Sequence, residues 1–142
     1  MKASKALSLC NCFAVRQAAR QVTRQYERYF AQADLTSAQF SILVALSEQG
    51  PMTMLDLATV LVMDRTTLLR AMKPLQREQL LRSAASDADP RQLVFALSPA
   101  GERKLKQAMP LWAKAQEEFE AGMGTREAAR LRSALLALAA GK

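Results

Sequence analysis

Apolar residues recur at three- and four-residue steps through most of the chain, which is the period of amphipathic helices. No residue from about Leu7 to Ala33 interrupts this pattern, so the sequence predicts one long first helix over that range. The apolar face of this helix should carry Cys12, Val15, Ala19, Val22 and Tyr26. The pattern therefore indicates a mainly helical protein.

Capping signals divide the middle of the chain into three further helices. Thr36 stands three residues before Gln39, the spacing of a capping box, and Gly50 should end the helix that follows. Thr53 and Asp64 are suited to N-cap two shorter helices, because a side-chain oxygen there can accept the free backbone N–H groups of the first turn. We therefore expect two short helices joined by a tight turn.

The apolar spacing predicts which side of each short helix is buried. The inward side of the first should carry Leu55, Ala58 and Leu61, and that of the second Leu68, Leu69, Met72 and Leu75. Pro74 should kink the second helix or loosen it after Arg70, because an interior proline removes one backbone hydrogen bond.

The remainder of the chain alternates β-forming and helical segments. Residues 81–85 and 92–97 are rich in β-formers on either side of an acidic turn, which predicts a hairpin. Ser98 and Pro99 supply an N-cap and a first-turn proline for a long helix to about Glu120. A Gly-Met-Gly break then precedes a last helix from Thr125, whose apolar stripe should be Ala128, Leu131, Leu135 and Leu138.

The order helix, helix, turn, helix and hairpin is typical of a winged helix-turn-helix, a mainly α fold with a small two- or three-stranded β-wing. In this fold the helix from Asp64 would enter the major groove of DNA. Guanidinium forks can grip guanine edges, hydroxyls can bind phosphates or bases, and lysines favour the backbone. The candidate DNA-binding residues on this helix are Arg65, Thr66, Thr67, Arg70 and Lys73. The alternative interpretation is an ordinary solvated helix face.

The hairpin tip carries a second candidate contact. Arg91 could enter a neighbouring minor groove, whose narrow and negative channel attracts arginine. Asp87 and Asp89 would be poor neighbours for phosphate, so we expect one of them to brace an arginine and fix the loop. An ordinary polar turn, with Asp and Pro chosen for turn geometry, explains the two acids equally well.

The amino-acid composition limits the kinds of partner and cofactor that we expect this protein to bind. The net charge of +7, from 20 basic and 13 acidic side chains, favours nucleic acid over other partners. The absence of histidine and of any metal-ligand cluster predicts neither a metal nor a cofactor. Two cysteines suggest a reducing compartment, hence the cytoplasm, and no apolar run approaches the roughly 20 residues that span a membrane.

Three segments together resemble the MarR family of bacterial regulators: "LTSAQFSILVAL", "LATVLVMDRTTLLRAMKPLQREQLL" and "DADPRQLVFALSPAG". The resemblance implies a DNA-binding repressor that binds a pseudo-palindromic operator as a homodimer. A small anionic or phenolic effector, or an oxidant, would release it. Residues 34–108 would form the winged-helix lobe, and residues 1–33 and 109–142 the dimerisation helices of a single MarR-like chain.

The stretch "CFAVRQAARQVTRQY" is also similar to the organic-hydroperoxide-sensing branch of that family. The similarity implies a reactive thiol at Cys12 and a partner at Tyr26, with Arg16 where a second tyrosine is expected. Alternatively, Cys12 is a small buried apolar residue. Cys10 should not bridge to Cys12, because side chains two positions apart on one helix point about 200° apart.

Three further interpretations remain at this point. Arg16, Arg20, Arg24 and Arg28 recur every four residues and either line an anion-accepting cavity or form the wet face of the first helix. A thiol-based peroxide-handling enzyme acting through Cys12 is an alternative function, although the chain lacks a paired acid and base, so we expect no enzyme. A winged-helix scaffold that binds protein is the third class.

Overall fold

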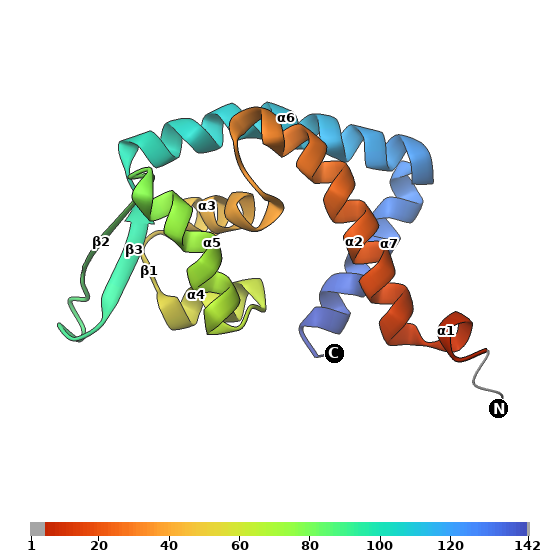
Figure 1. Ribbon diagram of the computed structural model, residues 1–142, viewed down its shortest axis with the longest axis horizontal. Coiled ribbons are helices and arrows are strands. Elements are labelled where there is room, and N and C mark those ends of the chain that lie inside the picture. The colour runs from red at the N-terminus through yellow and green to blue at the C-terminus, as the bar shows by residue number, and fades with distance from the viewer. Residues whose placement is uncertain (1–4, 142) are drawn as a thin grey trace.

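The computed structural model describes residues 5–141, which form an elongated, mainly helical molecule with a small sheet at one end (Figure 1). A long helix, α6, runs along the whole molecule and joins the sheet to the opposite end. In chain order the elements are α1 (Ala6–Leu9), α2 (Asn11–Phe30), the 3-10 helix η2 (Ala31–Ala33), α3 (Ser37–Gln49), β1 (Met52–Thr53), α4 (Met54–Leu61), α5 (Arg65–Arg77), β2 (Leu81–Ala85), β3 (Leu93–Leu97), α6 (Pro99–Met123) and α7 (Thr125–Ala139).

The sheet has three antiparallel strands in the order β1-β3-β2. In the hairpin β2–β3, the pairing runs from Leu81 with Leu97 to Ala85 with Leu93. Strand β1 pairs with the other edge of β3, where Met52 is opposite Phe95. The predicted hairpin is therefore confirmed, with β1 as a third strand. A mainly α fold with a small β-wing is confirmed as well.

The predicted single first helix, from Leu7 to Ala33, is broken at Cys10, whereas its end at Ala33 agrees with the structure, in which the last turn is the 3-10 helix η2. Cys10 has an extended backbone (φ −83°, ψ 112°) and separates α1 from α2, and its Sγ accepts a hydrogen bond from the Phe13 amide at 3.3 Å. At the other end α2 stops at Phe30, and Asp34 turns the chain in a left-handed conformation with φ 55°. The break at Cys10 carries no proline or glycine, so apolar spacing alone could not locate it.

The predicted helix caps are confirmed at four positions. Thr36 and Gln39 form the complete capping box of α3, and Thr53 accepts a hydrogen bond from the Asp56 amide at the start of α4. Ser98 accepts from the Gly101 amide at 3.0 Å and begins α6. Asp64 caps α5 in the same way.

Helix α5 is anchored by three fully buried side chains, Leu68, Met72 and Leu75, while Leu69 is half-buried. The helix continues through Pro74 to Arg77, so the predicted loosening after Arg70 is wrong. Burial on both sides of the proline holds the backbone helical despite the missing hydrogen bond.

Helix α4 is rotated relative to the prediction. Leu55 was expected to face inward, but it is 71% exposed, and Leu57 is the fully buried residue. Ala58 and Leu61 are half-buried. The eight-residue helix is buried through Leu57 because its packing against α3 and α5, and not its apolar spacing, decides which side faces the core.

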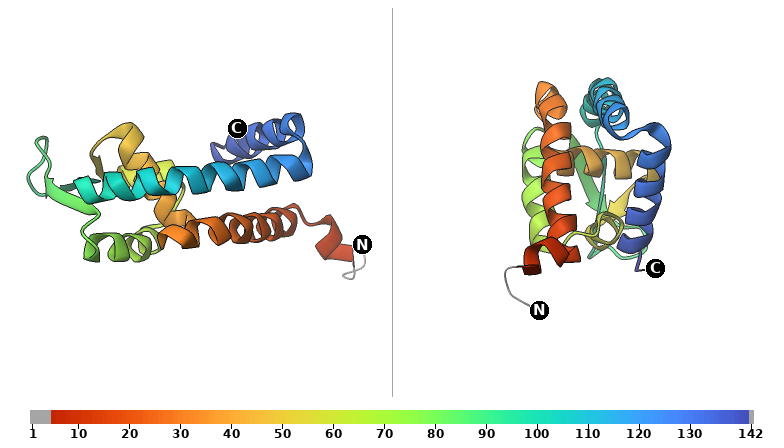
Figure 2. Two further views of the ribbon diagram at one scale, coloured as in Figure 1. Left: turned by 90° about the horizontal axis from the view of Figure 1, so that it is seen from above. Right: turned by 90° about the vertical axis from the view of Figure 1, so that its right-hand side faces the viewer.

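The molecule has two parts along α6 (Figures 1 and 2). The lobe comprises α3, α4, α5 and the sheet, and its core includes Phe40 stacked on Phe30 at 4.4 Å between ring centroids. The arm comprises α2, α7 and the second half of α6. On α7 the apolar stripe is largely uncovered, at Leu131, Leu135, Leu136 and Leu138. The segments expected to dimerise, 1–33 and 109–142, correspond to the arm, except that residues 1–4 and 142 lie outside the described part.

Within residues 5–141, no helix combines the length and apolarity that crossing a membrane requires.

A close backbone contact fixes the start of α6 against the base of the hairpin. The Leu80 carbonyl accepts a hydrogen bond from the Ser98 amide at 3.0 Å. A Cβ placed on Gly101 would lie 2.1 Å from this same carbonyl oxygen. Position 101 therefore admits no side chain without a shift of the backbone that carries the hairpin.

Gly101→Ala should lower the free energy of unfolding by about 1–3 kcal/mol, because the added methyl group overpacks a site bounded by backbone. Gly122→Ala is the matched control in the same helix, since a Cβ there meets nothing within 4 Å. The control should be neutral or stabilising by up to about 1 kcal/mol. Urea unfolding of both variants would measure the difference, and equal stabilities would show that the contact at Leu80 is not tight.

Candidate DNA-binding interface

The start of α5 is organised by Asp64. Its carboxylate accepts a hydrogen bond from the Thr67 amide at 3.4 Å and another from the Thr67 hydroxyl. The hydroxyl contact is the main reason that the pKa of Asp64 is lowered. Since the folded pKa lies below the unfolded one, the cap stabilises α5 above the unfolded pKa and is lost as pH falls through the folded pKa. Thr67, a candidate DNA contact, is thus engaged within the protein.

The other candidates on α5 reach solvent on two sides, because Arg65 lies about 80–140° around the helix from Thr66, Arg70 and Lys73. Arg65, Thr66, Arg70 and Lys73 are all exposed. At 100° per residue, Thr66, Arg70 and Lys73 lie within about 60° of one another, on the side away from the three buried anchors. Arg77 falls inside this sector and is also exposed. Sequence reasoning missed Arg77, although its spacing of seven residues from Arg70 was the signal that could have found it.

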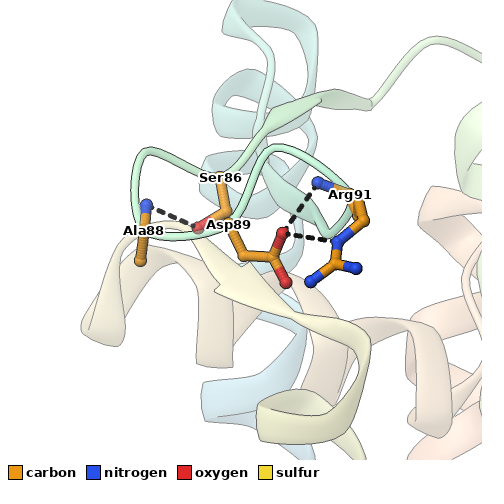
Figure 3. Close-up of polar contacts among 4 residues, drawn as sticks. All are labelled: Ser86, Ala88, Asp89 and Arg91. Atoms are coloured by element: carbon orange, nitrogen blue, oxygen red, sulfur yellow. Dashed lines mark hydrogen bonds and ion pairs between the residues drawn. The ribbon is translucent and has the colours of Figure 1, made fainter.

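The wing tip is held by short-range hydrogen bonds (Figure 3). Asp89 Oδ1 accepts from the Arg91 amide at 3.0 Å and from Arg91 Nε at 3.3 Å. The Ser86 amide donates to the Gln92 carbonyl at 2.8 Å and closes the loop. The Ser86 hydroxyl accepts from the Ala88 amide at 3.2 Å. Asp89 is therefore the acid that contacts an arginine, whereas Asp87 is simply exposed at the tip.

The ion pair between Asp89 and Arg91 leaves the two terminal nitrogens of the arginine available to bind another molecule. The Arg91 side chain is 91% exposed, and the contact uses Nε and not the two terminal nitrogens. Among the described residues, those terminal nitrogens have no hydrogen-bond partner. An exposed ion pair of this kind contributes less than about 1 kcal/mol to stability, so its main effect is to restrict where the guanidinium can go.

A groove of about 600 Å³ lies between α4, α5 and the wing. Arg65 from α5 and Arg91 from the wing both line it, although 26 positions separate them in the sequence. The remaining lining residues are Thr53, Met54, Leu55, Ala58, Leu69, Gln76, Gln92, Leu93 and Phe95. The two candidate cations thus face one open concave surface, with an apolar floor and amide side chains that sequence reasoning did not single out.

Two cavities of about 240 Å³ flank Tyr26. The first, here called the junction cavity, lies where the arm meets the lobe and is lined by Val22, Thr23, Tyr26, Phe30, Ser37, Phe40, Ser41 and Trp112. The Ser37 hydroxyl is buried and has no hydrogen-bond partner in the described structure. The second, the arm cavity, includes Tyr26 together with residues of α6 and α7.

Tyr26 is tied to the arm on one side. Its hydroxyl donates to Gln116 Oε1, and its pKa is raised, first by burial and then by the nearby Glu120 carboxylate, with Arg132 opposing. Arg16, Arg20, Arg24 and Arg28 line neither cavity, so the structure does not support the interpretation of the arginine series as the wall of an anion-accepting cavity.

Residues 35–93 match the MarR family model. The transcriptional regulator MosR of M. tuberculosis, solved in complex with DNA, is 35% identical over 93% of this chain and 95% of that chain, with a TM-score of 0.82. The chain belongs to the MarR family.

Other relatives agree with this assignment. The HTH-type transcriptional regulator MgrA of Staphylococcus aureus is 29% identical over 92 residues, which are 64% of this chain. The match spans 63% of the length of MgrA, so the chain covers somewhat less than two thirds of such curated relatives. The repressor CouR, bound to a 23-mer DNA duplex, shares the fold with a TM-score of 0.85 at 24% identity, covering 98% of this chain and 99% of that chain. These relatives are transcriptional regulators, not enzymes.

The comparisons establish the MarR family but do not test the hydroperoxide-sensing branch, which stays a prediction. Cys10 and Cys12 are both free and exposed, so Cys12 is not a buried apolar residue in the single chain. Arg16 is exposed, and Tyr26 lies 14 residues from Cys12, about 21 Å along α2. Cys12 and Tyr26 therefore do not meet within one chain. The predicted obstacle to a Cys10–Cys12 disulfide was that both side chains lie on one helix and point apart. This obstacle is absent, because Cys10 precedes α2 and has an extended backbone.

Proposed function

We propose that this protein is a transcriptional repressor that binds a pseudo-palindromic operator as a homodimer. The observation that carries the proposal is the shared groove, in which Arg65 of α5 and Arg91 of the wing face the same open surface. Two cations from different elements can therefore contact one polyanion at the same time. The DNA-bound relative MosR, at 35% identity, supports DNA as that polyanion.

In the proposed complex, α5 lies in the major groove and the wing tip in the adjacent minor groove. Arg65, Thr66 and Arg70 are exposed and can reach base edges, and the arginines can bind guanine in a bidentate manner. Lys73 is placed to contact phosphate. Arg91 would enter the minor groove through its free terminal nitrogens, with Asp89 restricting its orientation.

The homodimer is supported by the uncovered apolar stripe of α7. Leu131 and Leu135 are about two-fifths exposed, and Leu136 and Leu138 are exposed further, which is unusual for a helix with this spacing in a lone chain. A second copy packed on the arm would cover this stripe. It would also present two α5 helices to half-sites one helical turn apart. Acting on DNA, such a repressor would work in the cytoplasm.

DNA binding should be steeply salt-dependent, because each neutralised phosphate contributes about −0.9 to the slope of log affinity against log salt. Arg65→Ala and Arg70→Ala should weaken binding to a selected duplex and relax its sequence preference by about 1–3 kcal/mol per lost base contact. Arg91→Ala should weaken binding mainly at positions next to the half-site core. Lys114→Ala, an exposed change on α6, is the control.

Fluorescence anisotropy with labelled duplex would measure these effects. A flat salt response would contradict DNA binding. Retention of a protein partner by the arginine variants, without DNA binding by the parent, would instead support the protein-binding scaffold.

We further propose that release from DNA follows binding of an uncharged phenolic ligand in the junction cavity. Aromatic side chains surround this cavity, and the Ser37 hydroxyl and Tyr26 offer hydrogen bonds. No cation lines it, which favours a phenol over the anionic effector that the family resemblance also implies. Since the cavity joins α2 to α3, a ligand there would change how the lobe is held on the arm.

An oxidant acting on Cys12 is the alternative signal, and its exposure at the start of α2 favours reactivity with solutes. The two signals can be separated with one set of proteins. A panel of substituted phenols should release DNA from the parent and from Cys12→Ser, but not from Thr23→Phe, whose side chain would fill the cavity mouth. The same ligands should alter fluorescence from Trp112, the single tryptophan, which lines the cavity.

Gln21→Phe, an exposed change outside the cavity, is the control for the added ring. If cumene hydroperoxide released DNA from the parent but not from Cys12→Ser, and no phenol acted, the ligand proposal would be wrong and Cys12 would be the sensor.

A further inference from the structure

The positive charge of this protein is concentrated outside the lobe. Residues 1–33 contain six basic side chains and one acidic side chain, whereas the whole chain has a net charge of +7. The DNA contacts proposed above lie on α5 and the wing and use none of the six. The basic residues of α2 therefore need a separate explanation.

Three of these residues, Arg16, Arg20 and Arg24, form a single exposed series along α2, here called the arginine stripe. At 100° per residue, Arg16 and Arg24 lie about 40° on either side of Arg20, and the three span about 12 Å of helix. Like charges at this four-residue spacing repel one another and destabilise a helix. The stripe is thus unfavourable in isolation.

No acidic side chain offsets this repulsion in the part of the chain that the structure describes. None of the three stripe arginines forms an ion pair there, whereas the next member of the series, Arg28, pairs with Glu118 at 3.2 Å. The one acid of the first 33 residues, Glu27, instead accepts a hydrogen bond from the Ser37 amide at 3.1 Å. The stripe is therefore left as an uncompensated row of cations.

The stripe lies on the side of α2 that faces away from the rest of the arm. Val15 and Val22 are about 140–160° around the helix from Arg20. Val22 lines both cavities, next to residues of α3, α6 and α7. A second copy that covers the apolar stripe of α7 would extend onto this valine side. The arginine side points the opposite way and is exposed in the single chain.

In both views of Figure 2, α2 and α5 lie along the same side of α6, with α7 on the other. The exposed sector of α5 with Arg70 and Lys73 also points away from the core. The two helices thus occupy one flank of the molecule, with α2 leading from the lobe along the arm.

We propose that Arg16, Arg20 and Arg24 form a second contact surface for DNA phosphates, beside the half-site bound by α5 and the wing. This inference rests on the proposed function, since it concerns the same duplex. A duplex presents about seven phosphates over the 12 Å that the stripe spans, at one charge per 1.7 Å of axis. Such contacts carry no sequence information. They would add affinity without changing which operator is preferred.

The test compares the parent with the triple variant Arg16→Gln, Arg20→Gln, Arg24→Gln. The matched control is Lys106→Gln, Lys114→Gln, Arg126→Gln, which removes the same charge from exposed positions on α6 and α7. The probes are a duplex of about four helical turns, roughly 40 bp, selected with the parent protein, and a random-sequence duplex of equal length. Binding is measured by anisotropy between about 50 and 200 mM KCl.

The triple variant should bind both duplexes at least about tenfold more weakly than the parent, with an unchanged ratio between them. If all three arginines act in both subunits, the slope of log affinity against log salt becomes less steep by up to about 5. The control variant, which lacks the same number of charges, should show less than half of the change in slope that the triple variant shows. Circular dichroism and sedimentation equilibrium would verify that each variant is folded and dimeric.

Two outcomes overturn the inference, and one overturns the proposed function instead. An unchanged slope in the triple variant, with the parent binding DNA normally, shows that the stripe does not touch phosphate. A raised dimer dissociation constant with an unchanged slope shows that the stripe contacts a second copy. Failure of the parent itself to bind either duplex refutes the proposed function.

Discussion

The burial of one side of α5 is the constraint on which the rest of the interface depends. Leu68, Met72 and Leu75 are fully enclosed by the lobe, and burying each such side chain stabilises the fold by about 1.5–3 kcal/mol. A rotation of α5 by one residue would expose them and bury charged neighbours. The same packing therefore fixes Thr66, Arg70 and Lys73 on the solvent side. It also aims Arg65 at the groove shared with the wing.

The wing is positioned by backbone contacts at its base and by a carboxylate at its tip. At the base, the Ser98 hydroxyl donates to the Gln79 carbonyl at 2.6 Å, and Gly101 lets α6 approach Leu80 closely. At the tip, Asp89 holds both the amide and Nε of Arg91. The wing is therefore tied to the lobe at its base, and the Asp89 contact restrains Arg91 while leaving its two terminal nitrogens available to bind. Such preorganisation lowers the ordering cost of binding.

Local signals in the sequence were sufficient for most of the fold. The capping residues Thr36, Thr53, Asp64 and Ser98 act through their own neighbours, so their positions could be predicted without knowing the tertiary structure. The break at Cys10 could not, because no glycine or proline marks it. The exposure of Leu55 and the continuity of α5 through Pro74 depend on packing between helices, which apolar spacing does not describe.

The candidate site was predicted less completely than the fold. Residue types identified Arg65, Arg70 and Arg91, but only the tertiary structure brings Arg65 and Arg91 to one groove. Thr67 looked available from sequence, yet its hydroxyl is committed to Asp64. The junction cavity is assembled from α2, α3 and α6, so its aromatic lining and its lack of arginine could not follow from any single segment.

The central claim is that α5 and the wing of one subunit contact the same duplex. Methylation protection tests it directly, because dimethyl sulfate modifies guanine N7 in the major groove and adenine N3 in the minor groove. The structure predicts protection of both kinds within each half-site, with adenine protection lost in Arg91→Ala and guanine protection retained. Protection confined to one groove, or adenine protection unaffected by the loss of Arg91, would contradict the account.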